Sequence, residues 1–274
     1  MRMRLVFSDL DDSFLTRDKL VSARNLAALD ALAAAGGAFV PCTGRTIAGI
    51  PEVLRTHAAT RYLVGSNGGI IADVREDRVI HRELMSVETI CRIYERVREL
   101  NISFDCFVGQ HVYCERARYE AIGTFGLSEY NLRTVRSIRT PHDATIPELI
   151  EKTDGVEKVT LYWPDEAVAT ELAARLGEFD EVDATSSAAH NFEIMAHGTS
   201  KGSALLWLCE HTGTPVAETV AFGDAGNDAP MLRAAGIGIA VANATQEAKV
   251  AADVICGDCD ESGVGEWLLT ALER

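Results

Sequence analysis

The chain has 274 residues, enough for two domains that each bury a core of their own. Apolar residues make up 47% of the sequence and charged residues 24%, which is ordinary for a globular protein and excludes disordered and fibrous classes. A formal net charge of -15, without any block of Lys and Arg, excludes nucleic acid as an expected partner, because a phosphate backbone would be repelled. The same charge repels small anions, so an anionic substrate needs cations at its own site.

The N-terminal segment is basic, but the apolar stretch that follows ends at Asp9, too soon for a signal peptide or a membrane span. Seven cysteines without a framework spacing predict reduced thiols. We therefore expect a cytoplasmic protein with no membrane partner, and no obligate protein partner is evident. Cys256 and Cys259 form a C-x-x-C pair in a predicted loop, where a coincidence of surface residues is the favoured interpretation and a metal or redox role is the alternative.

The first part of the chain alternates strands and helices. Residues 5–7 form a short apolar run closed by polar residues, which predicts a buried strand ending at Asp9. Residues 22–35 have helical apolar spacing, and 38–40 begin another strand, so the segment is a β-α-β unit. Residues 62–71 contain the turn-prone sequence Ser-Asn-Gly-Gly between two apolar runs, which predicts a strand, a turn and a second strand.

The middle of the chain has a different pattern. It combines helices with alternating strands, predicted at 86–100 (helix), 102–108, 111–114 and 156–163 (strands), 165–176 (helix), and 182–184 and 192–195 (strands). This pattern predicts an inserted α+β domain of about 110 residues, within the usual size range of domains. We assign residues 1–84 and 191–274 to one discontinuous core and residues 85–190 to the insert.

The C-terminal part returns to regular alternation. Strands are predicted at 219–222, 237–241 and 254–255, with helices at 229–235 and 245–252 between them. Repeated strand-helix alternation predicts a parallel sheet covered on both faces, with ligands at the carboxyl ends of its strands. Both ends of the chain therefore belong to one α/β sheet.

Two polar segments follow strands in the N-terminal half. Asp9-Leu10-Asp11-Asp12-Ser13 places carboxylates at i and i+2 after a strand, a pattern that on its own is more typical of a cap or an acidic turn. Cys42-Thr43-Gly44-Arg45 follows the next strand, and its hydroxyl and glycine would allow backbone N–H groups to approach an anion. Neither segment decides a function by itself.

Two more polar segments occur in the C-terminal half. Lys201 stands at the head of an apolar helix, where a lysine opposes the helix dipole; this favours a nearby anion, with a solvated surface lysine as the alternative. Gly223-Asp224-Ala225-Gly226-Asn227-Asp228 puts two carboxylates and an amide between a strand and a helix, and Asp228 alone would also be a plain N-cap.

Four carboxylates are expected to converge at the sheet edge: Asp9, Asp11, Asp224 and Asp228. Like charges about 4 Å apart repel by ~4 kcal/mol at an effective dielectric near 20, so such a cluster needs a counter-ion. Oxygen-only ligands favour Mg²⁺ over zinc, which prefers His and Cys. The sequence therefore predicts a Mg²⁺ site at this edge.

These segments occur in the order and placement of the four motifs of haloacid dehalogenase-type phosphatases, which the chain resembles. Three further segments resemble the Cof-type branch of that superfamily: Ser66-Asn67-Gly68-Gly69, Phe192-Glu193-Ile194-Met195 and Val241-Ala242-Asn243-Ala244. The resemblance implies an α/β fold, with a Rossmann-like parallel-sheet core and an inserted α+β cap domain. Asp12-Ser13 stands where the commonest family pattern has Gly-Thr.

The resemblance also implies Mg²⁺-dependent hydrolysis of small phosphate monoesters, with sugar phosphates as the expected substrates. Asp9 would be the nucleophile that forms an aspartyl-phosphate, and Asp11 would be the general acid and base. The implied Mg²⁺ ligands are Asp9, Asp224 and the backbone carbonyl of Asp11. Asp228 would lie among or near the groups that surround these ligands. The implied phosphate ligands are Thr43, Gly44, Lys201, Asn227 and the Leu10 backbone.

Several alternatives stay open at this point. A phosphosugar mutase would use the same aspartyl-phosphate, and a regulator that only binds a phosphorylated metabolite would have no need of Asp11 as an acid. Arg45 is expected either to reach substrate or cap, or only to form an ion pair. Substrate-selecting residues are sought in the insert, where the candidates His111, Lys158, His190 and Asn191 are equally compatible with structural or surface roles.

Overall fold

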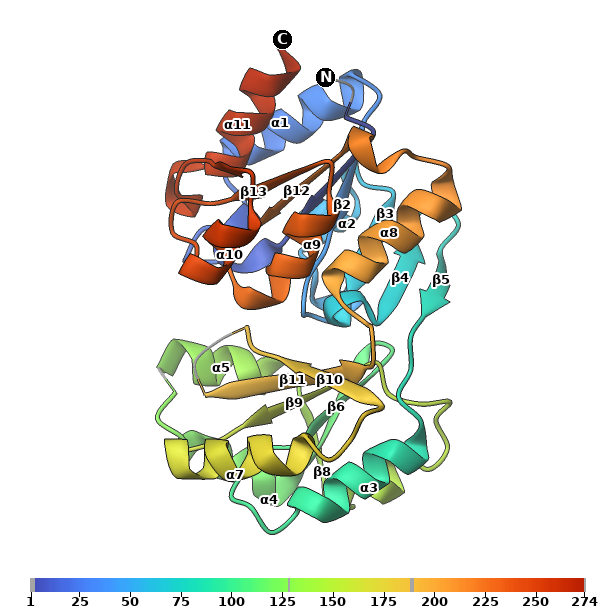
Figure 1. Ribbon diagram of the computed structural model, residues 1–274, viewed down its shortest axis with the longest axis vertical. Coiled ribbons are helices and arrows are strands. Elements are labelled where there is room, and N and C mark those ends of the chain that lie inside the picture. Colours follow the sequence, from blue (N-terminus) through green and yellow to red (C-terminus); the bar gives the residue numbers. More distant parts are fainter. Residues whose placement is uncertain (1–2, 128, 188–189, 274) are drawn as a thin grey trace. The chain divides into compact units, whose positions relative to one another are not determined.

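The computed structural model describes residues 3–127, 129–187 and 190–273 (Figure 1). The chain divides into two compact units, which we call the α/β unit (Met1–His81 with Thr199–Arg274) and the α+β unit (Arg82–Gly198). The predicted boundaries are different: the first core segment was expected to end at residue 84, and the second to begin at residue 191. The difference at the second boundary arises because β11 (Asn191–Ala196) pairs with strands of the α+β unit.

A five-stranded parallel sheet forms the centre of the α/β unit. Its order is β14 (Val254–Ile255), β13 (Ile237–Ala240), β12 (Thr219–Gly223), β1 (Leu5–Ser8) and β2 (Ala38–Pro41). Ser8 is in register with Pro41 on one side and with Phe222 on the other. The segments that follow β1, β2 and β12 therefore leave the sheet at the same edge.

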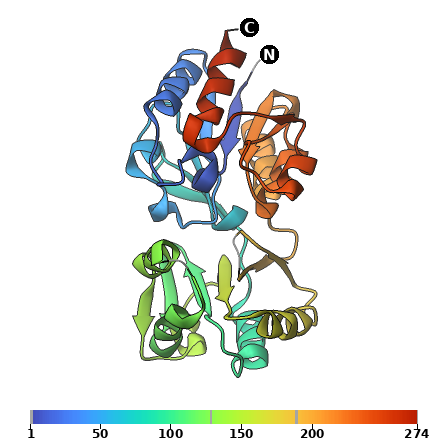
Figure 2. The same cartoon turned by 90° about the vertical axis from the view of Figure 1, so that its left-hand side faces the viewer.

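Helices cover both faces of this sheet (Figures 1 and 2). On one face, α1 (Ala23–Ala34) lies beside α11 (Gly263–Leu272), and Arg24 pairs with Glu266 between them. On the other face lie α8 (Lys201–Thr212), α9 (Ala229–Ala234) and α10 (Gln246–Ala251). The core between these layers is built from buried apolar side chains, which include Val6, Phe7, Leu29, Phe39, Val220 and Phe222.

A smaller sheet extends the α/β unit beyond β2. It contains β3 (Tyr62–Gly65), β4 (Ile70–Asp73) and β5 (Arg78–Arg82), and the short helix α2 (Glu52–Arg55) precedes it. β3 and β4 are antiparallel, which confirms the predicted strand-turn-strand. In the turn, Gly68 has φ 104°, and a Cβ there would lie 2.3 Å from the carbonyl oxygen of Ser200. Only glycine lets this turn approach the start of α8.

The α+β unit contains a six-stranded, mostly antiparallel sheet in the order β10, β11, β9, β6, β7, β8. Besides β11, its strands are β6 (Asp105–Val108), β7 (His111–Glu115), β8 (Thr140–His142), β9 (Lys158–Tyr162) and β10 (Val182–Thr185). Its helices are α3 (Val87–Val97), α4 (Arg116–Ala121), α5 (Glu129–Ser137), α6 (Ile146–Ile150) and α7 (Glu166–Leu176). Apolar side chains of α3, α6 and α7 pack on one face of the sheet and form a second core.

The predicted fold class is confirmed: a parallel-sheet α/β core carries an inserted α+β unit. The sequence analysis left the segment between residues 115 and 155 unassigned, where the structure has α4, α5, β8 and α6. These elements are short, so they carry too few periods of apolar spacing to stand out. Among the described residues, no helix combines the length and apolar character needed to cross a membrane.

Candidate active site

Asp9 lies directly after the central strand of the α/β unit. Its N–H donates to the carbonyl oxygen of Phe222 on β12 at 2.9 Å, which fixes the strand end against its neighbour. The residue is 6% exposed. A tight turn, Leu10–Phe14, follows it, with Asp12 in the left-handed region at φ 60°. The carboxylate therefore stands at the carboxyl edge of the sheet, where the sequence placed it.

Lys201 is the first residue of α8 and is fully buried. Its Nζ lies 2.5 Å from Oδ1 of Asp9 and 2.6 Å from Oδ1 of Asp228. The Ser200 side chain caps this helix end by accepting from the N–H of Ser203. The solvated-surface alternative for Lys201 is therefore wrong, because the lysine joins two carboxylates inside the protein.

Asp228 has partners at both carboxylate oxygens. Oδ1 contacts Lys201, and Oδ2 accepts from the backbone N–H groups of Asp224 and Ala225, each at 3.0 Å. Gly223 leaves room for this carboxylate, since a Cβ there would lie 2.4 Å from the Asp228 Cβ. Asp228 therefore closes the 223–228 loop and fixes Lys201, and its side chain does not cap α9.

Asp224 follows β12 and accepts a hydrogen bond from the Ser13 hydroxyl at 2.9 Å. Oxygen atoms of Asp9, Asp224 and Asp228 lie within 4.8 Å of one another. Burial, together with the charges of Asp228, Asp224 and Asp11, raises the pKa of Asp9 well above its usual value despite Lys201. Burial and the charge of Asp228 raise the pKa of Asp224 to about 7. One lysine therefore does not neutralise the cluster.

The Asp11 carboxylate is bound by the forked guanidinium of Arg45, with Nε to Oδ2 at 2.7 Å and Nη2 to Oδ1 at 2.5 Å. Lys19 adds a second cation, 3.4 Å from Oδ1. Burial by itself would raise the pKa of Asp11, but the hydrogen bonds and charges of Arg45 and Lys19 lower it. Of the two predictions for Arg45, the structure shows the ion pair, and its partner is Asp11.

The loops after β2, β3 and β12 are tied together at Asn67. Its N–H donates to the Thr43 carbonyl at 3.0 Å, and its side-chain oxygen accepts from the Asn227 amide at 3.2 Å. Thr43 is buried, whereas Gly44 is partly exposed in the same loop. Leu10 is buried in the turn after Asp9. All the predicted site residues thus belong to loops or a helix start at one edge of one sheet.

Sequence reasoning gave no role to Ser13, Lys19, Asn67 or Asn243, although each contacts this edge. The Asn243 amide donates to the Asp12 carbonyl at 2.7 Å, and its oxygen accepts from the N–H of Cys259 at 3.0 Å. Asn67 had a detectable signal, because a Ser-Asn-Gly turn favours the left-handed backbone that it adopts at φ 55°. Ser13 and Asn243 belong to segments that the family resemblance singled out, whereas the contact of Lys19 depends on tertiary structure that spacing does not reveal.

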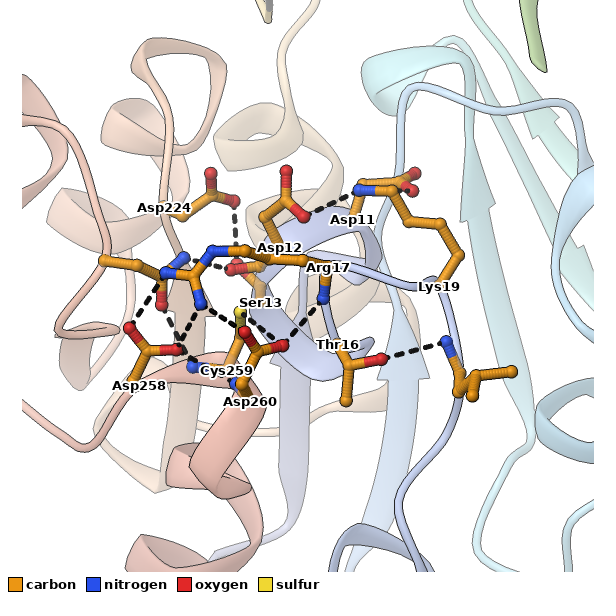
Figure 3. A network of polar contacts seen from close by, with 12 residues as sticks. Asp11, Asp12, Ser13, Thr16, Arg17, Lys19, Asp224, Asp258, Cys259 and Asp260 are labelled. Carbon is orange, nitrogen blue, oxygen red and sulfur yellow. Dashed lines mark hydrogen bonds and ion pairs between the residues drawn. The ribbon is translucent and has the colours of Figure 1, made fainter. Parts of the chain in front are cut away.

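The remaining sequence candidates belong to the 256–260 loop of the α/β unit and to the α+β unit. Cys256 and Cys259 are free thiols, and the carboxylates of Asp258 and Asp260 that flank Cys259 bind Arg17 (Figure 3). In the α+β unit, Lys158 is buried and pairs with Glu193. Of the other candidates in the insert, His111 is exposed, Asn191 is buried and His190 has a left-handed backbone.

A family model described as haloacid dehalogenase-like hydrolase matches residues 6–268, nearly the whole chain. The chain belongs to this family. Phosphatase YwpJ of Bacillus subtilis (strain 168) is 28% identical to this haloacid dehalogenase-like hydrolase, over 97% of this chain and 99% of that protein. Pyridoxal phosphate phosphatase YbhA of Escherichia coli (strain K12) is 25% identical, over 99% of this chain and 100% of that protein. The solved structure of a haloacid dehalogenase-like hydrolase from B. subtilis has a TM-score of 0.84 at 25% identity, over 97% of this chain and 99% of that one.

These findings confirm the resemblance to Cof-type phosphatases. The alignments span both units, so the similarity is not confined to the motifs. This haloacid dehalogenase-like hydrolase is a phosphatase, an enzyme that hydrolyses phosphate monoesters.

Proposed function

We propose that this phosphatase hydrolyses small phosphorylated metabolites, sugar phosphates above all, through an aspartyl-phosphate on Asp9 and with Mg²⁺. The observation that carries the proposal is the Asp9 carboxylate at the sheet edge, bound to the buried Lys201 and surrounded by further carboxylates. A structural ion pair would need one carboxylate for this lysine. The cluster has more carboxylates than that, and its excess negative charge would be offset by a bound cation.

The donor set fits Mg²⁺. The ligand atoms are oxygens, and burial with the neighbouring carboxylates raises the pKa values of Asp9 and Asp224, so both groups take up protons more readily than isolated carboxylates do. Asp9, Asp224 and the backbone carbonyl of Asp11 would hold the ion, while Asp228 has both oxygens engaged. A bound Mg²⁺ would supply positive charge opposite the phosphoryl oxygens and keep Asp9 ionised.

In the first step, an Asp9 carboxylate oxygen attacks phosphorus and the bond from phosphorus to the alcohol oxygen breaks. A phosphate dianion and an ionised carboxylate repel each other, so this attack needs cations on the phosphoryl group. Lys201 offers one at 2.5 Å from Asp9. Thr43, Gly44 and Asn227, with the Leu10 backbone, are the proposed neutral contacts that orient the phosphoryl group.

Asp11 is the proposed acid for the departing alcohol oxygen and then the base for the water that releases inorganic phosphate from Asp9. In the Arg45 fork, both Asp11 oxygens are engaged and its pKa is lowered, so the group is a carboxylate. It donates a proton only after it picks one up and turns at least one oxygen away from Arg45. Substrate binding must therefore rearrange the Arg45–Asp11 pair.

Relatives guide the choice of substrates to test. The 5-amino-6-(5-phospho-D-ribitylamino)uracil phosphatases YcsE and YwtE of B. subtilis are 25% and 26% identical to this chain. The substrate in their name carries its phosphate on a sugar-alcohol chain, which supports phosphorylated sugars and polyols as the first class to examine.

The test is a screen of sugar phosphates, polyol phosphates, pyridoxal phosphate, nucleotides and p-nitrophenyl phosphate for released inorganic phosphate, with and without Mg²⁺. The expected result is release that needs Mg²⁺ and disappears in Asp9→Asn. Isomerised sugar phosphate without released phosphate would replace the proposal by a mutase. Binding without any turnover would replace it by a regulator.

A further inference from the structure

Lys19 contacts the two carboxylates that follow the proposed nucleophile. Its Nζ lies 2.7 Å from Oδ1 of Asp12 and 3.4 Å from Oδ1 of Asp11 (Figure 3). The side chain is 20% exposed, so it is held against the protein rather than extended into solvent. Asp12 stands where the commonest family pattern has glycine, and its charge adds to an edge that is already negative.

The backbone places Lys19 at this position. After the turn that holds Asp11 and Asp12, Leu15 bridges to Val21, and the chain between them reverses. Within the reversal, the N–H of Thr16 donates to the Leu20 carbonyl at 3.0 Å and the Thr16 hydroxyl accepts from the N–H of Leu20 at 3.2 Å. Lys19 has φ 60°, a left-handed conformation that costs free energy for a lysine. This geometry turns its side chain back over Asp11.

A distant loop fixes the same reversal. The Arg17 guanidinium donates to both oxygens of Asp258 at 2.9 Å and also binds Asp260, and the Arg17 N–H donates to Asp260 at 2.9 Å (Figure 3). Asn243 joins the Asp12 carbonyl to the N–H of Cys259. The segment 16–20 is thus anchored from outside, which makes the position of Lys19 well defined.

We propose that Lys19 is a positioning residue, which holds the Asp11 carboxylate over the site when Asp11 turns away from the Arg45 fork. Its ammonium group stays on Asp12 at 2.7 Å and offers Asp11 a second, single-point contact at 3.4 Å. A single-point contact leaves the other Asp11 oxygen available for proton transfer, whereas the fork occupies both. The inference rests on the proposed role of Asp11 as the acid.

Leaving-group dependence tests this inference. An alkyl phosphate such as glycerol phosphate needs a proton on its departing oxygen, while p-nitrophenyl phosphate departs as a stable anion. The parameter kcat/KM reports the steps up to the first phosphoryl transfer, where the alcohol leaves. The test is therefore the ratio of kcat/KM for glycerol phosphate to that for p-nitrophenyl phosphate, measured with Mg²⁺ for wild type and variants.

Lys19→Met keeps most of the length of the side chain and removes its charge. We expect the ratio to fall about tenfold, a part of the roughly 10²–10⁴ that a general acid contributes. Lys19→Arg retains a cation that reaches both carboxylates and should restore the ratio to within about threefold. Lys152→Met removes an exposed lysine of the α+β unit in the same way and should leave the ratio unchanged.

Asp11→Asn separates the proposed acid role of Asp11 from the proposed positioning role of Lys19. If it leaves the ratio unchanged, Asp11 is not the acid and the proposed function fails in that part. If it lowers the ratio but Lys19→Met does not, only the inference on Lys19 is overturned. An equal rise in KM for both substrates in Lys19→Met would also overturn it, because Lys19 would then bind the phosphate itself. A lower melting temperature without a changed ratio would assign Lys19 a purely structural role.

Discussion

The two units of this chain each bury a cation among acidic groups, but with different charge balance. In the α/β unit, Lys201 contacts Asp9 and Asp228, with Asp224 close by. In the α+β unit, Arg139 is 7% exposed and donates to Asp105, which is 1% exposed, at 2.7 Å. Arg139 also donates to the carbonyl of Val135 on α5. The first cation serves a cluster with excess negative charge, and the second forms a pair that balances.

This difference indicates which buried charges belong to a reaction. A hydrogen-bonded pair of opposite charges leaves no net charge to be offset and can serve the fold alone. An unbalanced cluster is unfavourable until something else binds, and burial together with the neighbouring carboxylates raises the pKa values of Asp9 and Asp224. We therefore propose that ligand binding belongs to the sheet edge and that the Arg139–Asp105 pair has a structural role.

The largest expected effect is that of Asp9→Asn. The variant keeps the shape of the side chain but removes the nucleophilic oxygen, so kcat should fall by at least roughly a thousandfold. Steady-state phosphate release measures this, and circular dichroism verifies that the fold is unchanged. Activity within tenfold of wild type would remove Asp9 from the role of nucleophile.

Lys201→Met should reduce kcat by roughly 10²–10³, the range found when one preorganised charge contact to a developing oxyanion is lost. The variant also removes the group that lowers the pKa of Asp9, so more of the nucleophile is protonated at neutral pH. Its kcat/KM should consequently rise with pH over a higher pH range than that of wild type. A pH profile identical to that of wild type would mean that Lys201 does not act on Asp9.

Removal of Mg²⁺ directly tests whether the carboxylate cluster around Lys201 carries excess negative charge. Because the folded-state pKa of Asp224 is raised to about 7, its proton stabilises the metal-free fold below the unfolded value of 3.8, and this contribution is lost as pH rises through 7. Mg²⁺ competes with that proton. The increase in melting temperature on adding Mg²⁺ should therefore be larger near about pH 8 than near about pH 5.5.

Asp224→Asn is the matched control for this pH effect. It removes one of the charges that Mg²⁺ offsets, so the increase in melting temperature should be smaller and depend less on pH. The Mg²⁺ concentration for half-maximal activity should rise by about tenfold or more. An unchanged Mg²⁺ requirement in Asp224→Asn would place the ion on other residues.

The smallest effect on turnover is expected for the balanced pair. Arg139→Met leaves Asp105 buried without its partner and should destabilise the fold by about 3–5 kcal/mol. Below its melting temperature, however, the variant should hydrolyse p-nitrophenyl phosphate at a rate within about twofold of wild type. Urea unfolding followed by tryptophan fluorescence measures the first quantity. A large loss of turnover in a folded Arg139→Met would refute the assignment of that pair to structure alone.

The sequence predicted the regular part of this molecule well, because its signals are local. Apolar runs closed by polar residues placed β1 before Asp9, and helical spacing between Ser22 and Gly36 placed α1. Parallel strands carry their carboxyl ends to one edge, so the convergence of the segments after β1, β2 and β12 followed from the alternation. The likeness to a family then supplied roles that spacing alone left open.

What the sequence did not predict depends on contacts between distant segments. Arg17 meets Asp258 and Asp260 across more than two hundred residues, and no local pattern links them. Lys19 reaches Asp11 only because the chain reverses with a left-handed residue, a conformation that a lysine rarely signals. The unit boundary at Gly198 also differs from the predicted one at residue 191, because β11 pairs with strands of the α+β unit.

Trapping of the phosphorylated enzyme tests the central claim most directly. The phosphatase would be mixed with a rapidly hydrolysed substrate and Mg²⁺, quenched in acid, and reduced with borohydride, which converts an aspartyl-phosphate to homoserine. Peptide mass spectrometry should then find homoserine at position 9, dependent on substrate and absent in Asp9→Asn. Homoserine at another aspartate, or none under conditions of rapid turnover, would contradict the account of Asp9 as the nucleophile.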